Sequence, residues 1–163
     1  MTTTKFLTDV MLLKLGRWLR ILGVSTEFPA DSDDDSLLFQ AKSENLVLLT
    51  MDENLSKRAE KLGIKSFLIP HDKVRIADQL SLLVKRFKLP IKDFEERTLC
   101  TKCGGDLEIV DASEVKAKVP ADIPKRFKAV WRCKKCGQIY WKGGHWREIR
   151  KIVKSLKALK AKK

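Results

Sequence analysis

The four cysteines constrain the fold of this chain more than any other feature. They form two Cys-x-x-Cys pairs, Cys100 with Cys103 and Cys133 with Cys136, separated by 29 residues. Residues 1–5 are polar and carry no secretory signal, so we expect a cytoplasmic protein, whose reducing surroundings disfavour disulfides. The matched pairs predict one structural zinc site, ligated by all four cysteines and without an open coordination position, and redox-active dithiols are the alternative.

The net charge of +13 is concentrated in the part of the chain that carries the cysteines. Residues 1–99 contain 16 Lys and Arg against 15 Asp and Glu, whereas residues 100–163 contain 18 against 6. An excess of this size predicts an anionic partner, most often nucleic acid. No apolar run reaches the roughly 18 residues that a membrane span needs, so we expect no membrane partner.

The change in charge, the first cysteine and the helix-breaking Pro90 lie close together in the chain. We therefore predict an α/β domain at residues 1–92 and a small zinc ribbon at 93–148. Apolar residues at helical spacing then predict a basic amphipathic helix at 149–163 whose apolar face packs on the body, with a membrane-surface helix as the alternative.

In the first part of the chain, short apolar runs alternate with apolar residues at helical spacing. The runs predict strands at residues 6–7, 24–28, 46–49 and 64–69, and the spacing predicts helices at 11–22, 37–41, 55–62 and 76–87. Strands that alternate with helices are typical of βαβ units. The predicted fold class is therefore α/β, with a mostly parallel sheet flanked by helices.

Every predicted strand is followed by acidic residues. These residues are, in chain order, Asp9, Asp31, Asp33, Asp34, Asp35, Asp52 and Asp72. The carboxyl ends of parallel strands share one edge of the sheet, where functional residues gather in such folds. Clustered carboxylates repel one another and favour a hard cation such as Mg²⁺ or Mn²⁺, a pair of which can promote phosphodiester cleavage. The alternative for each residue is an ordinary helix N-cap.

Three basic residues, Lys14, Arg17 and Arg20, recur at intervals of three on the first predicted helix, beside Asp9. We predict that they hold substrate phosphates, for which the guanidinium group is well shaped. Salt bridges to the neighbouring carboxylates are the alternative.

Basic and aromatic residues are interleaved around the second cysteine pair, in two predicted hairpin strands at 127–131 and 138–141. Such a mixture predicts a surface for single-stranded nucleic acid, because cations contact phosphates and rings stack on bases. The alternatives are that the rings form the small core of the ribbon and that the histidine packs against it. The candidate binding residues are Lys128, Arg132, Lys134, Lys135, Tyr140, Trp141, Lys142 and His145.

Residues 9–23 read DVMLLKLGRWLRILG, which resembles the opening motif of the Mut-seven C-terminal RNase domain family, a branch of the PIN-like nucleases. DDSLL at 34–38 and LLTMD at 48–52 match the next two motifs in order. The cysteine pairs and YWKGGHW at 140–146 resemble the zinc-binding half of that family. The resemblance covers nearly the whole chain.

The resemblance implies a PIN-like fold, a fused zinc ribbon and a divalent-metal-dependent ribonuclease that acts on single-stranded or structured RNA, with ribosomal and transfer RNA as candidates. It places the catalytic acids at Asp9, Asp52 and either Asp34 or Asp35, with Asp9 and Asp52 as the main Mg²⁺ or Mn²⁺ ligands. Asp72 and Asp78 are both candidates for a fourth acid. We predict an endoribonuclease. The alternative function is a non-catalytic RNA-binding adaptor with a degenerate PIN-like domain.

Overall fold

The computed structural model describes residues 4–91 and 98–161. Its larger sheet has four parallel strands in the order β2-β1-β3-β4. The order reverses between β1 and β3, so the carboxyl ends of these two neighbouring strands flank the topological switch point of the sheet. The strands are β1 (Phe6–Thr8), β2 (Thr26–Glu27), β3 (Val47–Thr50) and β4 (Ser66–Leu68).

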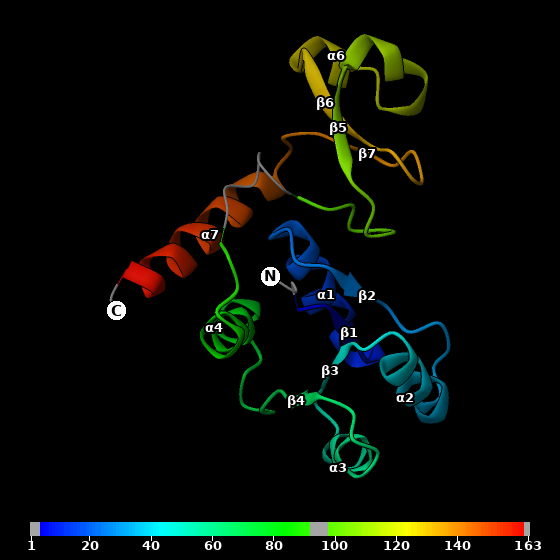
Figure 1. The fold of residues 1–163 in the computed structure, drawn as a ribbon. Coiled ribbons are helices and arrows are strands. Elements are labelled where there is room, and N and C mark those ends of the chain that lie inside the picture. The colour runs from blue at the N-terminus through cyan, green and yellow to red at the C-terminus, as the bar shows by residue number, and fades with distance from the viewer. Residues whose placement is uncertain (1–3, 92–97, 162–163) are drawn as a thin grey trace.

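Helices cover both faces of this sheet, which confirms the predicted parallel sheet flanked by helices (Figure 1). Successive strand residues point to opposite faces. Phe6 and Leu49 accordingly join the core under α1 and α4, and Leu7 and Leu48 join the core under α2 and α3. The helices are α1 (Leu13–Ile21), α2 (Asp34–Ser43), α3 (Glu53–Lys61) and α4 (Ile76–Phe87), and the 3-10 helix η1 (Val10–Leu12) precedes α1.

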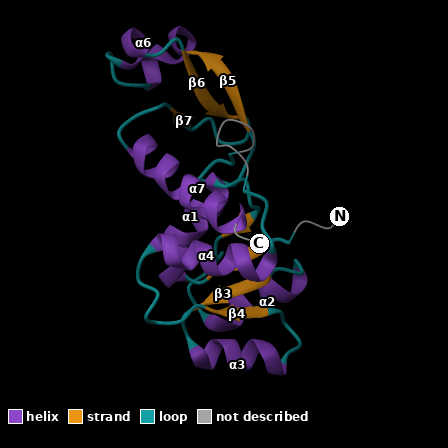
Figure 2. Ribbon diagram, turned by 90° about the vertical axis from the view of Figure 1, so that its left-hand side faces the viewer, coloured by secondary structure: helices purple, strands orange, loops and turns teal. Residues whose placement is uncertain are grey.

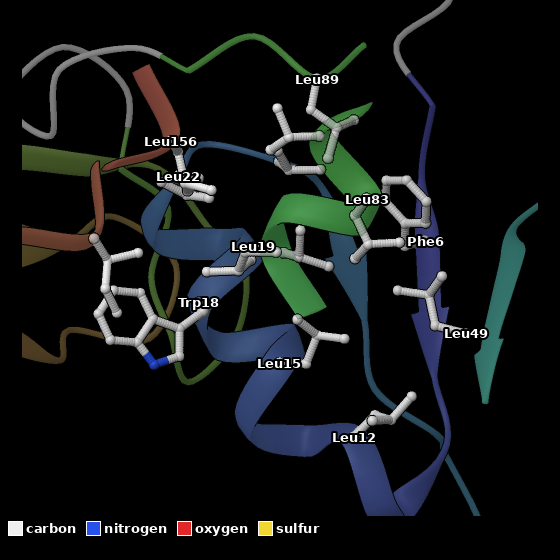
Figure 3. Close-up of a cluster of buried hydrophobic side chains, with 14 of the residues drawn as sticks. Phe6, Leu12, Leu15, Trp18, Leu19, Leu22, Leu49, Leu83, Leu89 and Leu156 are labelled. Carbon is white, nitrogen blue, oxygen red and sulfur yellow. The ribbon is translucent and has the colours of Figure 1, made fainter. Parts of the chain in front are cut away.

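The larger of the two cores lies between the sheet, α1 and α4 (Figure 3). The apolar stripe of α1 supplies Leu15, Trp18 and Leu19, all buried. Trp18, whose side chain is only 7% exposed, is therefore a core residue.

Several predicted elements are longer than the observed ones. The run at 24–28 yields only the two-residue β2, although Val24 is buried in the core. Ile69 is likewise buried but lies beyond β4. An apolar run indicates which residues are buried. Buried residues extend beyond those that form the hydrogen bonds of the sheet, so the predicted strands are too long. Met11, predicted to begin the first helix, lies in η1 and is 65% exposed.

The cysteine-containing part forms a separate antiparallel sheet in the order β5-β6-β7 (Figure 2). The predicted hairpin around the second cysteine pair is present as β6 and β7. The long segment between the pairs folds over the sheet as two short helices, which bury Val115 and Ile123 against Val130. The elements are β5 (Leu107–Asp111), η2 (Ala112–Lys118), α6 (Ile123–Arg126), β6 (Ala129–Cys133) and β7 (Ile139–Tyr140).

The last helix, α7 (His145–Ala161), returns to the body of the protein and lies beside α4 (Figures 1 and 2). Ile149, Ile152 and Leu156 are buried in the same core cluster as α1 and α4. The exposed residues of the helix include Arg147, Arg150, Lys151 and Lys154. The predicted boundary at 92/93 and the predicted final residues 162 and 163 lie outside the described residues.

Over residues 4–91 and 98–161, no helix combines the length and the apolar character that crossing a membrane requires.

Candidate active site and metal centre

Asp9 and Asp52 lie beyond the carboxyl ends of β1 and β3, and Thr50 connects them. The Thr50 hydroxyl donates a hydrogen bond of 2.5 Å to Asp9 Oδ2 and accepts one of 2.9 Å from the backbone amide of Asp52. Thr50 is fully buried and the Asp9 side chain is only 5% exposed. The sequence therefore brings these two predicted site residues together at the switch point of the sheet.

Both aspartates also cap helices. Asp9 Oδ1 accepts hydrogen bonds of 2.8 and 3.1 Å from the amides of Met11 and Leu12, at the start of η1. Asp52 Oδ1 accepts bonds of 2.7 and 3.0 Å from Asn54 and Leu55, at the start of α3. The capping alternative is thus correct for both residues. Both carboxylate oxygens of Asp9 accept hydrogen bonds, whereas Asp52 Oδ2 accepts none within the described part of the chain.

The acidic cluster after β2 divides into residues with different roles. Asp33 is the N-cap of α2 and accepts a 2.9 Å hydrogen bond from the Ser36 amide, and the hydrogen bonds from Ser36 lower its pKa. Asp34 and Asp35 are exposed in the first turn of α2, where Arg58 of α3 pairs with both carboxylates, at 2.9 Å from Asp34 Oδ2.

The predicted three-acid cluster is therefore not assembled in this structure. In the described ranges, the group of three or more His, Cys, Asp or Glu side chains within metal-binding reach consists of the four cysteines. Asp34 and Asp35 are instead paired with Arg58 of α3.

The two candidates for a fourth acid are each paired with a neighbouring cation. Asp72 is exposed beyond β4 and forms a 2.7 Å ion pair with Lys73, whose hydrogen bond lowers the pKa of Asp72. Asp78, in the first turn of α4, accepts a 2.9 Å bond from Arg75. Neither pairing distinguishes one candidate from the other.

Of the three basic residues on α1, Lys14 and Arg17 are exposed, whereas the side chain of Arg20 is only 2% exposed. The predicted phosphate contact of Arg20 needs correction. Arg20 lies in the last turn of α1, the end away from Asp9, because α1 runs antiparallel to the strands. A spacing of three on a nine-residue helix does not keep all three residues at one end.

Arg20 instead joins the body to the cysteine module. Its Nε donates a 2.8 Å hydrogen bond to the Thr26 carbonyl, its Nη1 donates one of 3.2 Å to the Thr101 carbonyl, and its guanidinium lies 3.9 Å from the centre of the Phe28 ring. Burial lowers the pKa of Arg20, and the nearby Glu27 opposes this shift. The guanidinium group of an arginine remains protonated in a protein even when it is buried.

The four cysteine sulfurs converge as the spacing predicts. Cys100 Sγ lies 3.6 Å from Cys136 Sγ, Cys103 Sγ lies 3.4 Å from Cys133 Sγ, and all four sulfurs lie within 4.8 Å of one another. These separations exclude disulfides, whose sulfurs are about 2.05 Å apart. They agree with the S···S distance of about 3.8 Å implied by a tetrahedral site with Zn–S bonds of about 2.3 Å. The cluster is compatible with structural zinc.

Two glycines shape the turns that carry these sulfurs. Gly104 and Gly137 follow the two pairs and adopt φ angles of +74° and +72°, a region that side-chain-bearing residues rarely occupy. Each turn closes with a backbone hydrogen bond, from Gly104 to Cys100 and from Gly137 to Cys133.

Tyr140 supports the centre from outside, with Oη 3.1 Å from Cys100 Sγ. Burial and this hydrogen bond raise the pKa of Tyr140 to about 12. Burial opposes ionisation of Cys100, but the hydrogen bonds of Tyr140 and of nearby amides outweigh it and lower the pKa of Cys100 to about 6. The hydroxyl of Tyr140, a residue whose ring is predicted to stack on a base, thus faces the cysteine cluster.

The other predicted nucleic-acid residues lie on the surface of the cysteine module. Arg132 is engaged with Glu108 at 2.7 Å, and Trp141 packs partly against the core formed with Ile123. The remaining members are exposed, namely Lys128, Lys134, Lys135, Lys142 and His145. These exposed residues supply polar and basic surface, whereas Phe127 and Trp141 pack against the core of the module.

Two residues of the site were not assigned a role from the sequence. In the sequence, Thr50 looks like any β-branched residue of a buried strand. Only its position two residues before Asp52 indicates a role in the site. Arg58 carries no signal, because its partners lie 24 and 23 residues earlier in the chain.

These features define a class of protein. Its members have a parallel α/β domain with paired aspartates at the switch point, joined to a four-cysteine module. The chain belongs to the Mut7-C RNAse domain family, whose model matches residues 4–153. Family membership indicates a ribonuclease-related function and an RNA substrate. Searches of curated proteins and of solved structures found no match.

Proposed function

We propose that this protein is a divalent-metal-dependent ribonuclease with a PIN-like domain, which cleaves RNA at the edge of the sheet that carries Asp9 and Asp52. The observation that supports this most directly is the hydrogen-bonded chain from Asp9 through Thr50 to Asp52. This network fixes the buried Asp9 carboxylate and the backbone of the exposed Asp52 at neighbouring strand ends, the place where parallel α/β folds bind substrates.

The donor atoms at this edge suit a hard cation. Mg²⁺ commonly uses one or two protein carboxylates and takes its remaining oxygens from water and substrate phosphate. Asp9 and Asp52 would hold the ion, with Asp34 or Asp35 completing the site after separation from Arg58. When bound, such an ion activates a water molecule and neutralises charge on the phosphate.

The residues of the chain itself would orient and retain the substrate. Thr50 holds Asp9 in one rotamer and positions the Asp52 backbone, so neither carboxylate must reorganise during reaction. The exposed Lys14 and Arg17 lie on the first turns of α1 after Asp9 and would contact phosphates near the scissile bond. The basic face of α7 and the cysteine module would attract the RNA from solution.

A non-catalytic RNA-binding adaptor is the second candidate, favoured by one observation: Arg58 already neutralises two of the expected acids. Labelled single-stranded RNA incubated with the purified protein and Mn²⁺ distinguishes the two functions. We expect cleavage by the wild type and a loss of at least about a hundredfold in Asp9→Asn and Asp52→Asn, because each removes a charged ligand but keeps the shape of the side chain.

The matched control is Asp111→Asn. Asp111 caps η2 as Asp52 caps α3, and it accepts a 2.8 Å bond from the Ser113 amide. Asparagine is as good an N-cap as aspartate, so helix starts are preserved in all these variants. Equal cleavage by the wild type and both site variants would point to a contaminating nuclease and contradict the proposal. No cleavage by any of them, with RNA binding retained, would favour the adaptor.

A further inference from the structure

An aromatic pocket lies at the junction of α1, the cysteine module and α7, at the end of α1 away from Asp9. Its volume is about 340 Å³, which is the size of a small-ligand pocket. Its floor includes Ile21, Leu99 and Ile149, contributed by three different segments. The aromatic residues that line it are Trp131, Tyr140, Trp141, His145 and Trp146.

Two of the rings that line the pocket are stacked on each other, and a cation lies close to both. Trp131 and Trp146 are stacked, with centroids 5.6 Å apart and planes inclined by 18°. The Lys142 ammonium lies 5.7 Å from the centre of the Trp131 ring and 5.3 Å from that of Trp146. Two stacked rings therefore line the pocket, and the ammonium group of Lys142, the next residue after Trp141, lies against both of them.

We propose that this pocket receives one unstacked base of the RNA strand, while Lys142 contacts an adjoining phosphate. The aromatic lining favours an aromatic ligand, and proteins that bind single strands hold splayed-out bases in this way. The charge of the surrounding module, 18 Lys and Arg against 6 Asp and Glu in residues 100–163, favours an aromatic ligand that is also anionic. A nucleotide satisfies both requirements.

This inference rests on the proposed function only for the identity of the nucleic acid as RNA. The pocket lies at the far end of α1 from the paired aspartates, so base binding and cleavage can be measured separately. We infer that the pocket positions the strand and does not take part in the chemistry.

The binding test compares a labelled single-stranded RNA of about 12 nucleotides with an abasic ribose–phosphate strand of the same length, without added Mg²⁺ or Mn²⁺. Fluorescence anisotropy gives the two affinities. We expect the wild type to bind the RNA about tenfold more tightly, because tenfold corresponds to about 1.4 kcal/mol and stacking of a single base is worth about 1–3 kcal/mol. Quenching of tryptophan fluorescence by RNA but not by the abasic strand is the second expected sign.

Two variants probe the pocket with little risk to the fold. Gly144 lines it, and a Cβ at this position meets no atom within 4 Å, so Gly144→Leu is expected to narrow the mouth and reduce the preference for bases. Lys142→Gln is compared with Lys116→Gln, which removes the same charge from an exposed site on η2. We expect Lys142→Gln to weaken RNA binding several times more than Lys116→Gln.

Photocrosslinking locates the bound base. RNA that contains 4-thiouridine is expected to crosslink within residues 140–146 of the wild type. Equal affinity of the wild type for the RNA and the abasic strand, or crosslinks confined to residues outside the pocket, would overturn the proposal. Asp52→Asn should keep the full preference for bases, so a failure of the nuclease proposal leaves this result intact.

Discussion

Thr50 and Thr8 show how the hydrogen-bond partners of a buried hydroxyl determine its effect on stability. Both are fully buried threonines on neighbouring strands of the same sheet. Thr50 donates to Asp9 and accepts from Asp52, whereas Thr8 Oγ1 is a buried oxygen without a hydrogen-bond partner in the described part of the chain. A buried hydroxyl that lacks a partner costs free energy, and one that is paired stabilises the fold.

Replacing each threonine by valine should therefore affect stability differently. Thr50→Val leaves two polar groups without their partner and is expected to lower the free energy of unfolding by about 1–3 kcal/mol. Thr8→Val removes the buried unpaired hydroxyl and is expected to leave that free energy unchanged or raise it by about 1 kcal/mol. Urea unfolding measures both midpoints. Equal losses in the two variants would contradict the network described for Thr50.

At the scale of single residues, sequence position predicted the candidate site in part. An aspartate one or two residues after a buried strand lies at the carboxyl edge, so the placement of Asp9 and Asp52 at the same edge followed from the pattern. The pairing of Asp34 and Asp35 with Arg58 did not, because it depends on how α2 and α3 pack side by side. The burial of Arg20 was likewise set by tertiary contacts.

Among the elements, α7 depends most on tertiary packing. Its basic composition alone would allow a solvated helix, but Leu156 is completely buried in the core cluster shared with α1 and α4. The apolar stripe holds the helix on the body, and the basic stripe faces solvent.

Leu156→Ala tests this packing. Leaving a cavity under α7 should reduce the free energy of unfolding by about 2–5 kcal/mol. Lys154→Ala, on the exposed side of the same helix, is expected to change it by about 0.5 kcal/mol or less. Thermal unfolding compares the two, and equal small effects would mean that α7 does not pack on the core in solution.

Element type was predictable here and element length was not. Continuous apolar runs identified the four strands of the first part, because the central strands β1 and β3 are buried on both faces. Helical spacing identified the four helices, because each buries one face. The apolar runs overestimated β2 and β4, since Val24 and Ile69 are buried without belonging to the ladder.

At the scale of the whole molecule, the cysteine centre and the body are mechanically connected. Arg20 reaches from α1 to the Thr101 carbonyl, and its own carbonyl accepts a 2.9 Å hydrogen bond from the Leu99 amide. The cysteine cluster was predictable from spacing alone, because two pairs of thiolates complete one tetrahedron. Its attachment through a buried arginine was not predictable, and the cytoplasmic location and the RNA target stay predictions.

Metal removal should therefore affect more than the cysteine module. Elemental analysis is expected to find one zinc ion per chain, and chelation should lower the melting temperature of the whole protein and red-shift its tryptophan fluorescence as Trp131 and Trp146 are exposed. Added zinc should restore both. Well under one zinc per chain in the freshly purified wild type, or a melting temperature that chelation leaves unchanged, would contradict this expectation.

The position of α1 has a consequence for the length of the substrate. The helix begins beside Asp9 and ends at Ile21, in the wall of the aromatic pocket. Its nine residues span about 14 Å, which a stacked strand covers in about four nucleotides at about 3.4 Å each. If both proposals hold, α1 sets the distance between the base in the pocket and the scissile bond. An oligonucleotide shorter than this distance can be bound in the pocket or cleaved at the aspartates, but not both.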